Sequence, residues 1–96
     1  MDVVDLGKIM DKVGKKYYNE KKAYGTFIEI WKNLENTENL VIISKELDNL
    51  QKITNKYYSK YGLSDEILDL QLWINKTRNK YDISDPNELL DNGFVQ

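Results

Sequence analysis

Apolar and aromatic residues recur every three or four positions along most of this 96-residue sequence. That spacing is the period of a helix with one buried face, whereas a half-buried strand alternates at every second residue. The short apolar run from Leu40 to Ile43 has no second candidate strand to pair with. The sequence therefore predicts an all-α fold.

The first apolar stripe runs from Leu6 to Leu34 and continues across Gly25 without changing phase. One uninterrupted helix of that length would span about 45 Å, whereas a compact domain of this size is about 32 Å across. Either the molecule is elongated or the segment breaks. We favour a break near Gly25, with Thr26 as the N-cap of a second helix.

Turn and cap residues divide the rest of the chain. Gly62 follows the second long stripe where a helix needs a left-handed residue, and Ser64 is a good N-cap for the next helix. Asp85 and Pro86 open a last short helix. We expect one domain over residues 1–96, with helices at about 3–24, 26–35, 38–61, 65–81 and 86–91. The predicted architecture is an elongated antiparallel helical bundle of three to four helices plus a short C-terminal helix.

The composition argues against several classes of function. Without cysteine or histidine, the chain has no thiol and lacks the commonest general base. No stretch approaches the roughly 18 consecutive apolar residues of a membrane span, and charges interrupt the N-terminal region where a signal peptide needs an apolar run. We expect a cytoplasmic protein, of a bacterium or an infected host cell, that makes no membrane contact.

Acidic residues give the one arrangement that would suit a metal ion. Asp65, Glu66 and Asp69 lie within about one helical turn and would suit Mg²⁺ or Ca²⁺. We interpret them instead as solvent-facing charges that favour the start of a helix. No catalytic residue, metal or cofactor is predicted, and we expect that the protein is not an enzyme.

Tyrosines flanked by lysines are the most distinctive local feature. The tripeptide Lys-Tyr-Tyr at 16–18 recurs at 56–58. The first tyrosine of each pair continues an apolar stripe and is interpreted as partly buried. The second, Tyr18 or Tyr58, lies off the stripe, so we predict that both are exposed and belong to a contact surface. The interleaved lysines would also allow stacking on single-stranded nucleic acid.

Other candidate contact residues come from an apolar excess and from lysine pairs. One helix face cannot bury all of Leu72, Trp73 and Ile74, so a partner or an oligomer contact would cover the excess. A core position is the other interpretation of Trp73, and the more favoured one. Lysines clustered near residue 20 would attract an acidic partner, although a solvated helix face is the more favoured interpretation. The predicted partner-binding residues are Tyr18, Lys21, Lys22, Tyr58 and Trp73.

Together these features favour a binding protein over an enzyme. In size and helical character the chain resembles small phage and mobile-element proteins and the four-helix bacteriocin immunity proteins, but it carries no motif of theirs. We expect a non-enzymatic inhibitor that occupies a surface of a larger host or defence protein, as anti-defence, antitoxin and immunity proteins do. A self-associating structural or assembly protein is the alternative. A nucleic-acid-binding regulator is less favoured, because the net charge is −2 and such domains are usually basic.

Overall fold

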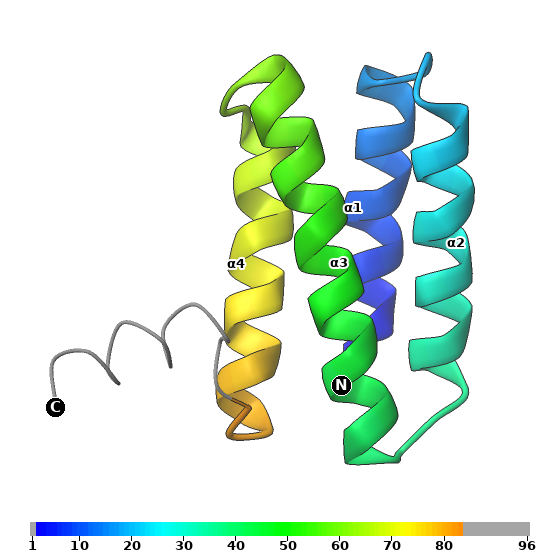
Figure 1. Ribbon diagram of the computed structural model, residues 1–96, viewed down its shortest axis with the longest axis vertical. Coiled ribbons are helices and arrows are strands. Elements are labelled where there is room, and N and C mark those ends of the chain that lie inside the picture. The colour runs from blue at the N-terminus through cyan, green and yellow to red at the C-terminus, as the bar shows by residue number, and fades with distance from the viewer. Residues whose placement is uncertain (1, 84–96) are drawn as a thin grey trace, which may run out of the picture.

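A computed structural model describes residues 2–83 of the chain. Within that range the chain forms no strand and four helices, which are α1 (Val3–Lys16), α2 (Lys21–Glu35), α3 (Leu40–Tyr61) and α4 (Asp65–Lys80). The helices stand side by side and alternate in direction (Figure 1). The predicted all-α antiparallel bundle is therefore confirmed, while the expected short helix at 86–91 lies outside the described residues.

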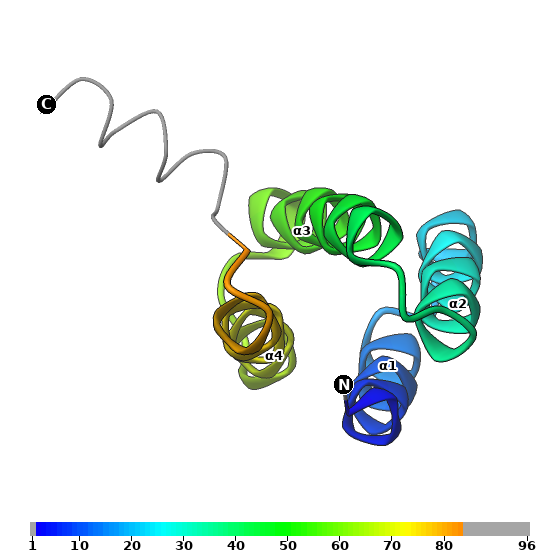
Figure 2. The same ribbon diagram turned by 90° about the horizontal axis from the view of Figure 1, so that it is seen from below.

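The four helices form a ring when viewed along the bundle (Figure 2). α1 and α3 each pack against both α2 and α4, so the chain closes on itself between its first and last described helices. α3 has 22 residues and is therefore about 33 Å long. In the part of the chain that is described, no helix is both long enough and apolar enough to cross a membrane.

The first apolar stripe breaks earlier than predicted. α1 ends at Lys16 and α2 begins at Lys21, so the turn comprises residues 17–20. Gly25 lies inside α2. The Thr26 hydroxyl donates to the carbonyl of Lys22 at 3.2 Å, as a threonine inside a helix does. The predicted break at Gly25 and the predicted Thr26 cap are therefore wrong.

Gly14 lets α1 and α2 approach closely just below this turn. A Cβ atom at Gly14 would lie 2.4 Å from Cε1 of Tyr24, because the tyrosine ring of α2 lies directly on the glycine. Only a residue without a side chain fits under the ring in this position. The sequence therefore sets the close approach with Gly14, while the turn itself contains neither glycine nor proline.

The other helix boundaries follow the cap residues. Gly62 ends α3 with a φ of 78°, which confirms the positive φ predicted for this position. Ser64 caps α4, since its Oγ accepts a hydrogen bond from the backbone N–H of Ile67 at 3.3 Å. Asn39 caps α3 in the same way, accepting from the N–H of Val41 at 2.9 Å. α3 therefore begins at Leu40, two residues after its predicted start.

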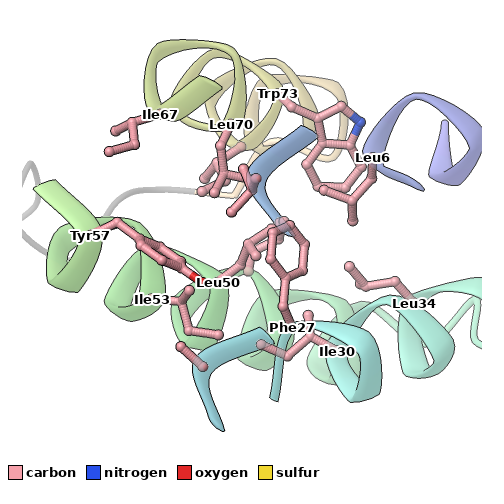
Figure 3. Packing of buried hydrophobic residues seen from close by; sticks show 14 of the residues in the cluster. Leu6, Phe27, Ile30, Leu34, Leu50, Ile53, Tyr57, Ile67, Leu70 and Trp73 are labelled. Carbon is pink, nitrogen blue, oxygen red and sulfur yellow. The ribbon is translucent and has the colours of Figure 1, made fainter. Parts of the chain in front are cut away.

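The core receives side chains from every helix. Leu6 of α1, Phe27 of α2, Leu50 of α3 and Leu70 of α4 are each fully buried, and Figure 3 shows such side chains converging in the interior. Burying a large apolar side chain contributes about 1.5–3 kcal/mol. The apolar stripes thus provide the main stabilisation of the bundle.

A polar band joins α3 to α4 beside this core. The side-chain amides of Gln51 and Gln71 exchange hydrogen bonds of 2.7 and 2.9 Å. The guanidinium of Arg78, which is only 4% exposed, donates to Gln51 at 3.1 Å and to Asp48 at 3.2 Å. Buried polar groups require such partners, so this band fixes how the two helices face each other.

Candidate functional site

Four of the five predicted contact residues lie at the same end of the bundle. Tyr18 belongs to the turn between α1 and α2, and Lys21 and Lys22 form the first turn of α2. Tyr58 lies in the last turn of α3, which ends beside that turn at the upper end in Figure 1. We call this region, residues 15–24 and 56–66, the tyrosine end.

Trp73 does not join them. Its side chain is only 6% exposed, and its indole N–H donates to the backbone carbonyl of Asp2 at 2.9 Å. Trp31 donates in the same manner to the carbonyl of Val3 at 2.7 Å. Trp73 therefore occupies a core position, the other interpretation that the sequence allowed, because the indole holds the start of α1 inside the bundle. Its role in partner binding stays a prediction.

Three tyrosine rings form the base of the tyrosine end. The ring centroid of Tyr17 lies 5.0 Å from that of Tyr57 and 4.6 Å from that of Tyr61. Tyr17 and Tyr57 are buried, more completely than the partial burial expected from their positions on the apolar stripes, while Tyr61 is 43% exposed. Packed aromatic pairs add about 0.5–1.5 kcal/mol beyond their buried area. The cluster therefore gives the exposed side chains above it a firm support.

The three hydroxyl groups of this cluster have different surroundings. The Tyr17 hydroxyl lies 2.7 Å from Oγ of Ser64, and the Tyr61 hydroxyl donates to Oε1 of Glu20 at 2.6 Å. The Tyr57 hydroxyl has no hydrogen-bond partner among the described residues. Burial, with a smaller contribution from the Glu20 charge, raises the pKa of Tyr57 to about 12.

Glu20 links the start of α2 to the end of α3. The Lys60 ammonium and the Tyr61 hydroxyl both donate to its carboxylate. The hydrogen bond from Lys60 is the main reason that the pKa of Glu20 is lowered, and the same bond raises the pKa of Lys60. The sequence analysis missed this group because its members are about 40 residues apart. The repeated Lys-Tyr-Tyr segments were the available signal that the two regions are related.

Exposed aromatic and apolar side chains project from this support. Tyr18 is 71% exposed and Tyr58 is 55% exposed, which confirms that both lie on the surface. Their role in a contact remains a prediction. Leu63 in the next turn is 66% exposed, so these three large side chains, together with the less exposed Tyr61, are available for contact in one region.

The charges at the tyrosine end are mainly positive. This region contains six lysines and three carboxylates, in a chain whose net charge is −2. Lys16 pairs with Glu66 at 3.4 Å. Lys21, Lys22 and Lys56 form no ion pair with any described residue. Lysines in the first turn of a helix oppose the helix dipole, so Lys21 and Lys22 contribute nothing evident to stability.

The tyrosine end suits a surface contact with a macromolecule better than binding or catalysis of a small molecule. The hollow between Glu20, Tyr57 and Lys60 has no room even for a water molecule, whereas small-molecule sites measure about 300–1,000 Å³. Within residues 2–83, no three Asp or Glu side chains come together as metal ligands. Glu66, one of the three acidic residues considered above, instead pairs with a lysine.

The geometry of the tyrosine end is the basis for a functional proposal, because comparisons with protein-family models, curated proteins and solved structures do not supply one. None of the three comparisons finds a match for this chain.

Proposed function

We propose that this chain is a small non-enzymatic binding protein that acts by occupying a surface of a larger protein through its tyrosine end. The observation that carries the proposal is the exposure of Tyr18 and Tyr58 beside lysines that lack a carboxylate partner among the described residues. An inhibitor of the anti-defence, antitoxin or immunity type would act in this way. Its encoding by a phage or mobile element, and its action in the cytoplasm of a bacterium or infected cell, belong to the same proposal.

The physical reason is the low cost of placing tyrosine in an interface. A tyrosine side chain offers a large area with both apolar and polar character, and it loses little conformational entropy on binding. Tyr18 directly follows the buried Tyr17, and Tyr58 follows the buried Tyr57. Both exposed rings therefore extend from anchored backbone, and a partner would not have to order this surface.

The lysines favour a partner with an acidic surface. Unpaired lysines at the rim of an interface accelerate association with an acidic protein, and salt weakens the effect. Single-stranded nucleic acid would also meet lysine and tyrosine here. We favour a protein because the exposed set includes Leu63, which can neither stack on bases nor bind phosphate.

Affinity purification with matched variants tests the proposal. Tyr18→Ser/Tyr58→Ser removes the exposed rings, and Leu40→Ser/Val41→Ser is a control at the opposite end of the bundle. The control residues are 53% and 77% exposed, much like the two tyrosines. Wild type, variant and control would each be used as bait in lysate of the source cells, and captured proteins would be quantified by mass spectrometry.

We expect one protein to be enriched by wild type and control and lost with the tyrosine variant. That protein, once purified, should then bind directly with micromolar affinity or better. If all three baits capture the same proteins equally, the tyrosine end is not the binding surface. If the difference between baits disappears after nuclease treatment, the partner is nucleic acid and the proposal fails.

A further inference from the structure

A shallow groove runs between α1 and α4, on the side of the bundle. On α1 it is lined by Asp5, Lys8, Ile9 and Lys12, and on α4 by Asp69, Leu72, Trp73 and Lys76. Each set follows the spacing i, i+3, i+4 and i+7, which places its members on one face of a helix. The groove is therefore formed by two helical faces that lie side by side along the bundle. We refer to it as the α1/α4 groove.

An exposed leucine marks the α4 side of this groove, and a second lies beside it. Leu72 is 55% exposed, and Leu68, one turn away on α4, is 42% exposed. Trp73 and Ile74 are buried, so Leu72 is the residue of the apolar triplet that the bundle does not cover. Ile9 on α1 is partly buried and packs against the core. The centre of the groove is therefore apolar, with one open leucine.

The charged residues at the four corners of the groove alternate in sign. α1 and α4 run in opposite directions, and the ion pair of Lys16 with Glu66 shows which of their ends meet. Lys12 and Asp69 therefore flank the groove toward the tyrosine end, while Asp5 and Lys76 flank it toward the start of α1. Each helix carries one sign at one end of the groove and the opposite sign at the other.

This pattern is complementary to itself. When a second copy faces the groove about a two-fold axis parallel to the helices, α1 of each copy lies over α4 of the other. Lys12 then faces Asp69 of the second copy, and Asp5 faces Lys76. Lys8, at mid-height on α1, faces the apolar side of α4, where its stem covers Leu72. An axis running across the groove would instead place Lys8 against Lys8.

We propose that the α1/α4 groove binds a second copy of this chain, forming a two-fold dimer in which both tyrosine ends point the same way. A foreign partner of uniform charge, such as nucleic acid, would meet like charges at half of these positions. A second copy meets opposite charge at every one and covers Leu72 as well. Self-complementarity of this kind is what a two-fold interface requires.

The dimer is independent of the function proposed above, because the groove and the tyrosine end involve different residues. If both proposals hold, each dimer presents two tyrosine ends on one side. A partner with two copies of the target surface would then be bound with higher avidity than by one chain.

Analytical ultracentrifugation of the full chain tests the dimer. We expect wild type to shift from 11.3 kDa toward twice that mass as its concentration rises through the micromolar range. Leu72→Ser should raise the dissociation constant about tenfold or more, because each dimer buries two copies of the residue. The control Leu40→Ser/Val41→Ser should dimerise as wild type does.

Charge reversal gives the sharper test. Lys12→Glu/Lys76→Glu makes all four end positions acidic, and Asp5→Lys/Asp69→Lys makes them all basic. Each variant alone should sediment as a monomer, while an equimolar mixture should form the dimer. A misfolded variant would not regain association on mixing, and helical circular dichroism checks the folding of each. The absence of cysteine also allows one spin label per chain beside the groove on α1, at Lys15→Cys or Val4→Cys.

The outcomes separate clearly. Restored dimer in the mixture, with short label-to-label distances for Lys15→Cys and for Val4→Cys alone, supports the parallel two-fold dimer. A wild-type protein that remains monomeric at high micromolar concentration overturns the proposal. So does a Leu72→Ser variant that dimerises as wild type does, a mixture that stays monomeric, or a short distance only between Lys15→Cys and Val4→Cys. None of these outcomes depends on whether the tyrosine end binds a foreign protein.

Discussion

The two ends of the bundle place their aromatic side chains differently, since Trp31 and Trp73 turn inward at one end and Tyr18 and Tyr58 turn outward at the other. Each tryptophan has one polar atom, and a backbone carbonyl near the start of α1 accepts its hydrogen. Both exposed tyrosines leave most of their surface to solvent. The location of the polar partner thus distinguishes a structural aromatic residue from one that is available for binding.

Removing one aromatic residue from each end gives the largest expected contrast. Trp73→Ala should lower the free energy of unfolding by about 3–5 kcal/mol, since it leaves a cavity and removes the donor to Asp2. Tyr58→Ala should change it by no more than about 0.5 kcal/mol, because the ring is largely exposed. Urea denaturation measures both. Equal losses would mean that Tyr58 has a structural role and would weaken its assignment to a binding surface.

The second-largest expected effect is a loss of folding stability at alkaline pH, caused by Tyr57 in the base of the tyrosine end. Below pH 10, Tyr57 binds its proton in both the folded and unfolded states. Above pH 10 the unfolded chain loses that proton, while the folded pKa is about 12. Folding stability should therefore fall between pH 10 and 12, with a limiting slope of about 1.4 kcal/mol per pH unit from this group.

Urea denaturation of wild type and Tyr57→Phe across this range isolates that effect. The variant should lose less stability than wild type between pH 10 and 12, because it lacks the group that titrates. Tyr18→Phe, which changes an exposed ring, is the matched control and should behave as wild type does. Parallel curves for wild type and Tyr57→Phe would show that Tyr57 ionises normally in the folded protein.

At neutral pH, the hydroxyls of the two buried tyrosines should contribute different amounts to folding stability, and this effect is smaller than the one at alkaline pH. Tyr17→Phe removes the contact with Ser64 and should cost about 0.5–1.5 kcal/mol. Tyr57→Phe removes a hydroxyl without a partner among the described residues and should be neutral or stabilising. Thermal melts of the two variants decide the point. A larger loss of stability for Tyr57→Phe than for Tyr17→Phe would mean that the Tyr57 hydroxyl, and not the Tyr17 hydroxyl, makes the stronger hydrogen bond.

The smallest effect concerns the two glycines near the tyrosine end. Gly25→Ala should raise stability by about 0.5–1 kcal/mol, since Gly25 lies inside α2 with open space where a Cβ would be. Gly14→Ala should show no such gain, because the Tyr24 ring must move first. Thermal melts compare the pair. A destabilised Gly25→Ala would place a break at that residue after all.

The sequence predicted the helices well where local signals coincide. Gly62 and Ser64 fixed the end of α3 and the start of α4, because each acts through its own backbone or side chain. The break between α1 and α2 was misplaced, since the stripe continues from Tyr17 to Tyr24 in helical phase and hides the turn. Asn19, which favours turns, was the available signal.

The surface was predictable only where exposure follows from helical phase. Tyr18 and Tyr58 lie off the stripes, and both are exposed. The same reasoning left Trp73 open between a core position and a contact surface, because its partner Asp2 is 71 residues away. It also missed Glu20, which meets Lys60 from a distant part of the chain. Such contacts depend on how the helices assemble, which the period of one helix does not specify.

The hydrogen bond between Trp73 and Asp2 has a consequence for synthesis of the protein. Its partners are separated by 71 residues, so at about 5–20 residues per second a ribosome needs roughly 4–14 seconds to make the second after the first. Throughout that interval Leu6 and Val13 of the nascent chain lack the cover that α4 later provides. α1 therefore stays open to a chaperone at the ribosome until α4 has been made.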